Sequence, residues 1–133
     1  MDWTNAHATG IPAVDDQHKV LFKSVNDFRK ALEANEREDS CGPMLTFLER
    51  FTRKHFVFEE GCMEQHRCPV AQQNKREHAA ILATLHVHRE WYTTGGYDPN
   101  DAHLLLDALE HWLESHICRV DRQLKHCVKS TDA

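Results

Sequence analysis

The feature that most constrains this chain is a helical period of apolar residues, which recurs in four stretches separated by three short polar breaks. The stretches run over about 15–35 and about 42–65, then onward from Pro69, and finally from near Asn100. Each stretch has room for roughly 20 residues of helix, or about 30 Å. Because short connections make successive helices antiparallel neighbours, the pattern predicts an all-α, up-down-up-down four-helix bundle.

The remaining segments complete the expected organisation. The first 14 residues, which include Gly10 and Pro12, are predicted to form a non-helical arm. Proline suits the first turn of a helix, which agrees with helix starts near Pro69 and Pro99. A chain of 133 residues has the usual size of one domain, so we expect 1–133 to fold around one buried core.

The composition argues against several partners. The 16 basic and 21 acidic residues give a net charge of −5 without a basic run, so nucleic acid is not expected to bind. Because no apolar run could cross a bilayer and the start does not resemble a signal peptide, we expect a soluble, cytoplasmic protein without membrane contact. The cysteines form no CxxC pair, and in such a chain they are expected to be reduced and mostly buried. They are Cys41, Cys62, Cys68, Cys118 and Cys127.

Four of the 11 histidines lie in phase with the buried stripes, one in each predicted helix: His18, His55, His78 and His116. Glu59 follows His55 by four positions and shares its face. A single histidine on an apolar face is more often a hydrogen-bonded core residue. Four of them with a carboxylate, whose buried charge must be matched, indicate a metal in the bundle core. The other histidines are assigned to the surface or to loops: His7, His66, His86, His88, His103, His111 and His126.

The types of donor narrow the choice of metal. Imidazole and carboxylate ligands suit iron, manganese or zinc. More than four ligands are too many for one tetrahedral zinc ion, whereas two octahedral ions bridged by carboxylates would use them all. Neither the HExxH pattern of zinc proteases nor the Glu-x-x-His pairs of carboxylate-rich diiron bundles occurs in the sequence. Asp15, Glu60 and Glu77 are expected to support the ligands or to face solvent.

Four segments, in this order, resemble the hemerythrin family, specifically its bacterial single-domain branch. They are Asp15–His18, His55–Glu60, Glu77 with His78, and Trp112–Ile117 followed by Asp121. The resemblance implies that His18 and His55 bind one iron ion and that His78 and His116 bind a second. It further implies that Glu59 and Asp121 bridge the ions, together with an oxo or hydroxo group.

The place of Asp121 in this set does not follow from helical period alone. It lies five positions after His116, about 140° around an ideal helix. Two routes would bring it to the site: a wide buried stripe, since Asp121 aligns with Ile117 and Leu124, or a local π-type widening of the helix.

Asn74 departs from the family pattern. The family normally has a further histidine four positions before His78, and asparagine is a weaker oxygen donor or no ligand at all. The iron bound by His78 and His116 is therefore expected to keep a water molecule, an added ligand or a weak bond to Asn74.

The resemblance also implies a ligand for the metal pair. Reduced iron would bind O2, or another small diatomic molecule or anion, beside His18 and His55. Apolar neighbours are expected to exclude water there, although the same residues also fit plain core packing. They are Leu21, Phe22, Phe56, Leu113 and Ile117.

Three functions stay open on these grounds. The first is a sensory domain whose response to O2 or redox state regulates a signalling output, such as a fused diguanylate cyclase or chemoreceptor. The second is an O2 carrier or store, and the third is an enzyme acting on peroxide or nitric oxide. Asn74 favours the sensor, since an accessible iron pair should autoxidise quickly. The domain itself is then not expected to be an enzyme.

Overall fold

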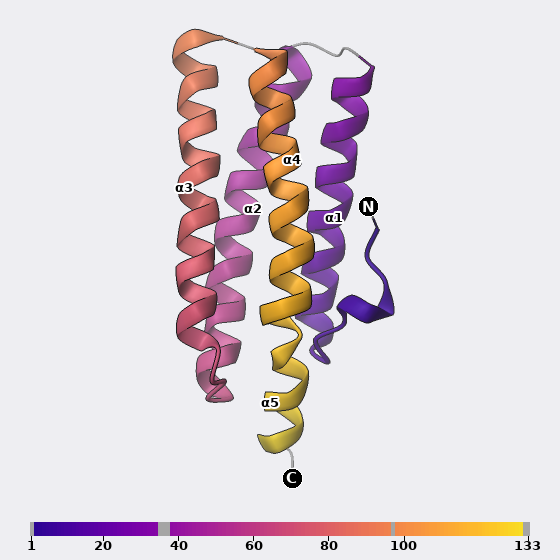
Figure 1. Ribbon diagram of the computed structural model, residues 1–133, viewed down its shortest axis with the longest axis vertical. Coiled ribbons are helices and arrows are strands. Elements are labelled where there is room, and N and C mark those ends of the chain that lie inside the picture. Colours follow the sequence, from indigo (N-terminus) through magenta and orange to yellow (C-terminus); the bar gives the residue numbers. More distant parts are fainter. Residues whose placement is uncertain (1, 35–37, 97, 132–133) are drawn as a thin grey trace.

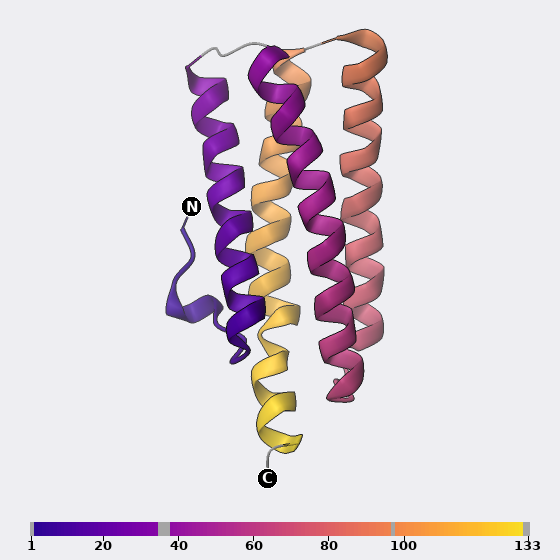
Figure 2. The same ribbon diagram turned by 180° about the vertical axis from the view of Figure 1, so that it is seen from behind.

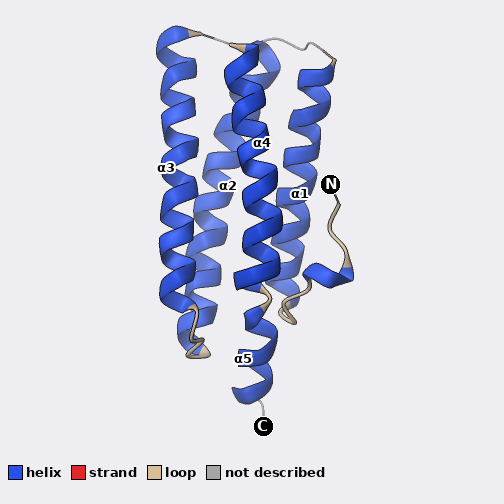
Figure 3. Ribbon diagram, in the orientation of Figure 1, coloured by secondary structure: helices blue, strands red, loops and turns tan. Residues whose placement is uncertain are grey.

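The computed structural model describes residues 2–34, 38–96 and 98–131, and within these ranges every regular element is a helix (Figure 3). The four long helices are α1 (Pro12–Glu33), α2 (Glu38–Gln65), α3 (Ala71–Gly95) and α4 (Pro99–His116). They pack in the ring order α1–α2–α3–α4, and successive helices run antiparallel (Figures 1 and 2). The predicted up-down-up-down bundle is confirmed. Within the same ranges, no helix has both the length and the apolar character that crossing a membrane requires.

Below α4 the chain changes its helical geometry and then continues. A turn of π-helix, η2 (Ile117–Asp121), leads into the short helix α5 (Gln123–Thr131). The amide of Arg122 donates to the carbonyl of Ile117 at 3.0 Å, a bond that spans five residues instead of the usual four. α5 extends past the ends of the long helices at the foot of the bundle (Figure 1).

The core consists of two apolar clusters with a polar layer between them. The upper cluster comprises Leu21, Phe22, Val25, Phe28, Leu32, Leu45, Leu48, Phe56, Ile81, Leu85, Leu105, Leu106, Leu109, Leu113 and Ile117. The lower cluster comprises Val14, Met63, Cys68, Val120, Leu124 and Cys127. On α1, for example, His18 comes between Val14 of the lower cluster and Leu21 of the upper. The predicted polar residues therefore share one level of the bundle.

The N-terminal arm is shorter and more regular than predicted. α1 begins at Pro12, whose fixed φ suits the first helical position. The arm also contains a 3₁₀ turn, η1 (Asn5–His7), so the prediction of a wholly non-helical arm was wrong. Thr4 stabilises this turn, because its backbone N–H donates to Nδ1 of His7 at 2.9 Å.

The prediction that the cysteines are reduced was wrong for two of them. Cys68, in the turn between α2 and α3, and Cys127, in α5, form a disulfide. Their Cα atoms lie 5.5 Å apart, a separation that a disulfide can span. Cys62 and Cys118 are free and partly buried, and the side chain of Cys41 lies outside the described part of the chain.

Candidate metal centre

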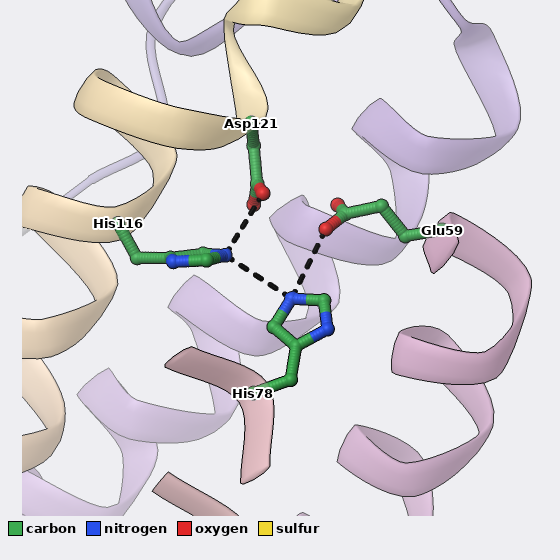
Figure 4. A group of neighbouring side chains, drawn as sticks. All are labelled: Glu59, His78, His116 and Asp121. Atoms are coloured by element: carbon green, nitrogen blue, oxygen red, sulfur yellow. Dashed lines mark hydrogen bonds and ion pairs between the residues drawn. The ribbon is translucent and has the colours of Figure 1, made fainter. Parts of the chain in front are cut away.

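One group of buried side chains joins three of the long helices and the π-turn. Glu59 of α2, His78 of α3, His116 of α4 and Asp121 of η2 point toward one another (Figure 4). Nε2 of His78 lies 3.1 Å from Nε2 of His116 and 3.1 Å from Oε1 of Glu59. Nε2 of His116 lies 2.9 Å from Oδ1 of Asp121. Ligand atoms on four elements thus converge at one point.

A second group shares the same carboxylates. Nε2 of His18 lies 2.9 Å from Oε2 of Glu59 and 3.2 Å from Oδ2 of Asp121. Nε2 of His55 lies 3.3 Å from the same Oε2 of Glu59. Glu59 therefore turns one oxygen to His18 and His55 and the other to His78, while Asp121 turns one oxygen to His18 and the other to His116. The structure brings all six predicted donors together.

The π-turn accounts for the place of Asp121. Five residues of an α-helix would turn the side chain about 140° away from His116. The wider turn at Ile117–Asp121 holds more residues per revolution, so Asp121 returns to the same face and is buried there. Of the two routes expected from the sequence, the structure has the π-type widening.

Hydrogen bonds behind three of the imidazoles set their tautomers. Nδ1 of His78 donates to Oε2 of Glu60 at 2.9 Å, and Nδ1 of His116 donates to Oε1 of Glu77 at 2.9 Å. With the proton on Nδ1, Nε2 of each ring turns its lone pair inward, as a metal ligand must. Gln17 does the same for His55, because its Oε1 lies 2.6 Å from Nδ1. Sequence analysis missed Gln17, although it directly precedes His18.

Aromatic rings hold two of the ligand imidazoles from the side. Phe56 stacks on His78 with ring centroids 3.6 Å apart and planes 2° from parallel. Trp112 stacks on His116 with centroids 4.3 Å apart. The sequence placed Phe56 in the O2 pocket and Trp112 in a segment that resembles the family, but it did not indicate that both rings contact ligands.

Burial and hydrogen bonding shift the pKa values of the buried ligand side chains in opposite directions. Burial would lower the pKa of His18, but hydrogen bonds to Asp121 and Glu59 outweigh it and raise the pKa to about 10. Burial would likewise raise the pKa of Glu59, yet the hydrogen bond from Nε2 of His18 to its Oε2, 2.9 Å long, helps to hold it well below its usual range. Without a metal the centre therefore keeps its carboxylate ionised and a proton on His18. A bound cation must displace that proton.

The donor set fits a cation on further grounds. Oε1 of Glu59 and Oδ1 of Asp121 are buried and accept no hydrogen bond from the described residues, although both lie near imidazole nitrogens. Buried carboxylate oxygens without donors are costly unless a positive charge faces them. Nitrogen and oxygen donors in this number suit iron better than one tetrahedral zinc ion.

Asn74 is buried on α3, one helical turn before His78. Its side-chain nitrogen and oxygen have no hydrogen-bond partner among the described residues. α3 also contacts η2. Because Asn74 comes four positions before His78, it shares the face of α3 that carries this histidine, and its amide is unpaired among the described residues.

The five predicted pocket residues are all buried beside or above the polar layer: Leu21, Phe22, Phe56, Leu113 and Ile117. Leu21 and Leu113 also line a cavity of about 20 Å³ between the helices, together with Ile81 and Leu109. A space of this size holds about one water-sized molecule.

His7 does not lie where the sequence placed it. It was assigned to the surface or a loop, but it is buried, with its ring centroid 4.9 Å from that of Phe22. Its Nε2 pairs with Oε2 of Glu114 at 3.2 Å, which ties the arm to α4. The pairing joins residues 107 positions apart, so no local period could have indicated it.

The fold and the donor set together define a metal-binding four-helix bundle. The hemerythrin HHE cation binding domain matches residues 9–128, and the chain belongs to this family. It is 27% identical over 128 residues to a bacteriohemerythrin of Stenotrophomonas maltophilia, covering 96% of this chain and 81% of that protein. It is 28% identical to a myohemerythrin of Sipunculus nudus, covering 92% and 89% of the two chains. The crystal structure of a wild-type hemerythrin superimposes with a TM-score of 0.85, at 26% identity, covering 96% of this chain and 97% of that one.

Proposed function

We propose that the centre holds two iron ions, one bound by His18 and His55 and the other by His78 and His116. Glu59 and Asp121 would each serve both ions. The observation that carries this proposal is the division of each carboxylate, with one oxygen toward each histidine pair. A single ion would leave one oxygen of each carboxylate and one histidine pair unused.

We further propose that the domain binds O2 or a similarly small molecule at this centre. Bound as ferrous ions, the metal pair would supply the electrons that O2 accepts. The protein supplies a dry enclosure, because apolar clusters cover the polar layer on both sides. A buried, apolar site excludes water and protons from the groups that would hold the metal.

The physiological role that we favour is a sensor of O2 or redox state that acts on a signalling output, fused or separate. The support is Asn74, which is buried and whose amide has no hydrogen-bond partner among the described residues. Asparagine is a weaker ligand than the histidine that the resemblance to the family would place at this position. An iron ion with fewer protein ligands is open to exchange and should oxidise readily. The closed apolar enclosure is the observation that favours the second candidate, an O2 carrier or store.

Anaerobic iron loading followed by stopped-flow mixing with O2 tests these proposals. We expect two iron ions per chain after desalting, and then rapid conversion to a diferric spectrum. A long-lived oxygenated spectrum would favour the carrier, and steady O2 consumption with added reductant would favour an enzyme. Fewer than two ions per chain would overturn the proposed diiron centre.

Replacing Asn74 by histidine is expected to prolong any oxygenated form, because a third imidazole would occupy the coordination position that asparagine leaves weak or vacant. The measurement is the lifetime of the oxygenated spectrum after mixing with O2. Gln72→His is the matched control, since it adds a histidine to an exposed position of the same helical turn. An unchanged lifetime in Asn74→His would remove Asn74 from the argument for a sensor.

A further inference from the structure

A covalent link closes the lower end of the bundle. Cys68 follows α2 in the turn toward α3, and Cys127 lies in α5, 59 positions later in the chain. Both residues belong to the lower apolar cluster, which packs against the underside of the polar layer. The disulfide therefore joins two segments that are far apart in the sequence, the turn between α2 and α3 and the helix α5.

α5 is short and only partly buried. Of the side chains of 123–127, Leu124 and Cys127 are buried, and both pack in the lower cluster. Its backbone contacts η2, the turn that precedes it, and Lys125 lies beside Gly10 of the N-terminal arm. The helix extends beyond the four long helices (Figures 1 and 2). A short helix at the end of a bundle opens at low free-energy cost. The disulfide attaches it covalently to the turn between α2 and α3.

The same segment carries a proposed metal ligand. Asp121 is the last residue of η2, only two positions before α5 begins. Its neighbour Val120 packs in the lower cluster with Leu124 and the cysteine pair. When α5 is anchored, it restrains the π-turn that precedes it, and the π-turn positions the Asp121 carboxylate. The attachment of α5 therefore affects the geometry of the metal centre.

We propose that the Cys68–Cys127 disulfide is a redox clasp, opened by an external dithiol reductant, that controls how firmly α5 holds Asp121 at the centre. The effect on Asp121 rests on the proposed metal centre, whereas the opening and closing of the disulfide does not. Disulfides in reducing compartments are usually transient and act in redox sensing or catalysis.

The chemistry is ordinary thiol–disulfide exchange. A thiolate of the reductant attacks one sulfur, the Cys68–Cys127 bond breaks, and a mixed disulfide forms while the other cysteine leaves as a thiolate. The second thiol of the reductant then closes its own disulfide and releases the protein. Two electrons and two protons pass to the protein, which gains two thiols. Cys62 lies against the same cluster, but burial raises the pKa of its thiol, so it is a poor internal attacker.

The first test needs no iron. Treating the metal-free protein with dithiothreitol and then removing it should add two titratable thiols, and peptide mapping of the untreated protein should find Cys68 linked to Cys127. Hydrogen exchange at the amides of 123–131 should become at least about tenfold faster after reduction, and equally fast in Cys127→Ala. Cys41→Ser, which changes a cysteine near the start of α2 at the opposite end of the bundle, should behave like the untreated protein. Absence of the linkage, or unchanged exchange in the reduced protein, would overturn the clasp.

The second test measures the link to the centre. After anaerobic loading with ferrous iron, transfer of iron to a chelator should be about tenfold faster from the reduced protein and from Cys127→Ala than from the oxidised protein or Cys41→Ser. Equal rates would show that the clasp does not act on Asp121. If even the oxidised protein binds no iron, the proposed function fails, while the thiol count and hydrogen exchange still decide whether the clasp exists.

Discussion

Replacing Glu59 by glutamine is expected to abolish stable binding of the metal pair. Glu59 is fully buried and directs its two oxygens to three imidazoles of both histidine pairs. The amide removes the negative charge and presents an N–H₂ group where one metal ion would sit. Changes to groups behind a ligand cost about 10–100-fold in metal affinity, so the loss of a shared ligand should exceed 100-fold.

The measurement is iron content after anaerobic loading and desalting, together with chelator competition. We expect two ions per chain in the unchanged protein and fewer than one in Glu59→Gln. Glu64→Gln is the matched control, because Glu64 is an exposed carboxylate on the same helix. A Glu59→Gln protein that retains both ions would rule out the bridging role.

The same substitution should also destabilise the metal-free protein near neutral pH. The pKa of His18 is raised to about 10 by Asp121 and Glu59 against the opposing effect of burial, so its imidazolium depends on these carboxylates. Breaking a buried charged pair from one side costs about 3–5 kcal/mol in general. Urea unfolding of the metal-free Glu59→Gln and Glu64→Gln proteins would separate this loss from the loss of metal.

Replacing Phe56 by alanine is expected to lower the free energy of unfolding by about 3–5 kcal/mol, the usual cost of removing a buried phenylalanine ring. Phe56 is buried in the upper cluster and stacks on His78 at 3.6 Å. The cavity left behind would also free the His78 ring to tilt. We therefore expect the ion proposed to be bound by His78 and His116 to be released faster than the ion proposed to be bound by His18 and His55.

Phe58 provides the control for that experiment. It is the same residue type on the same helix, but 41% of it is exposed, so Phe58→Ala should cost less than about 1 kcal/mol. Urea unfolding of the metal-free proteins, followed by circular dichroism, measures both values. Similar losses in the two variants would mean that Phe56 contributes no more than a surface phenylalanine.

The parts of the structure that were predictable share a local cause. Apolar residues at helical spacing predicted the four helices and their antiparallel order, and both are confirmed. The same period selected His18, His55, Glu59, His78 and His116 as inward-facing. Because a helix has 3.6 residues per turn, the sequence position of a side chain fixes the direction in which it points. The buried face of a helix can therefore be predicted from the sequence.

Asp121 marks the boundary of that reasoning. Resemblance to a family named it, while helical period pointed it away from His116. A single π-turn returns it to the site. The amide of Asn74, which has no partner in the described part of the chain, is a similar case, because its burial shows only after the helices are assembled.

The sequence by itself determined the helices, their buried faces and the donor types, because each depends on residues a few positions apart. Only the tertiary structure decided which distant groups meet: His7 with Glu114, Gln17 with His55, and Cys68 with Cys127. These contacts depend on how far apart the packed helices lie and how each is rotated about its axis. All four helices determine these distances and rotations together, so they cannot be predicted from any single stretch of the sequence.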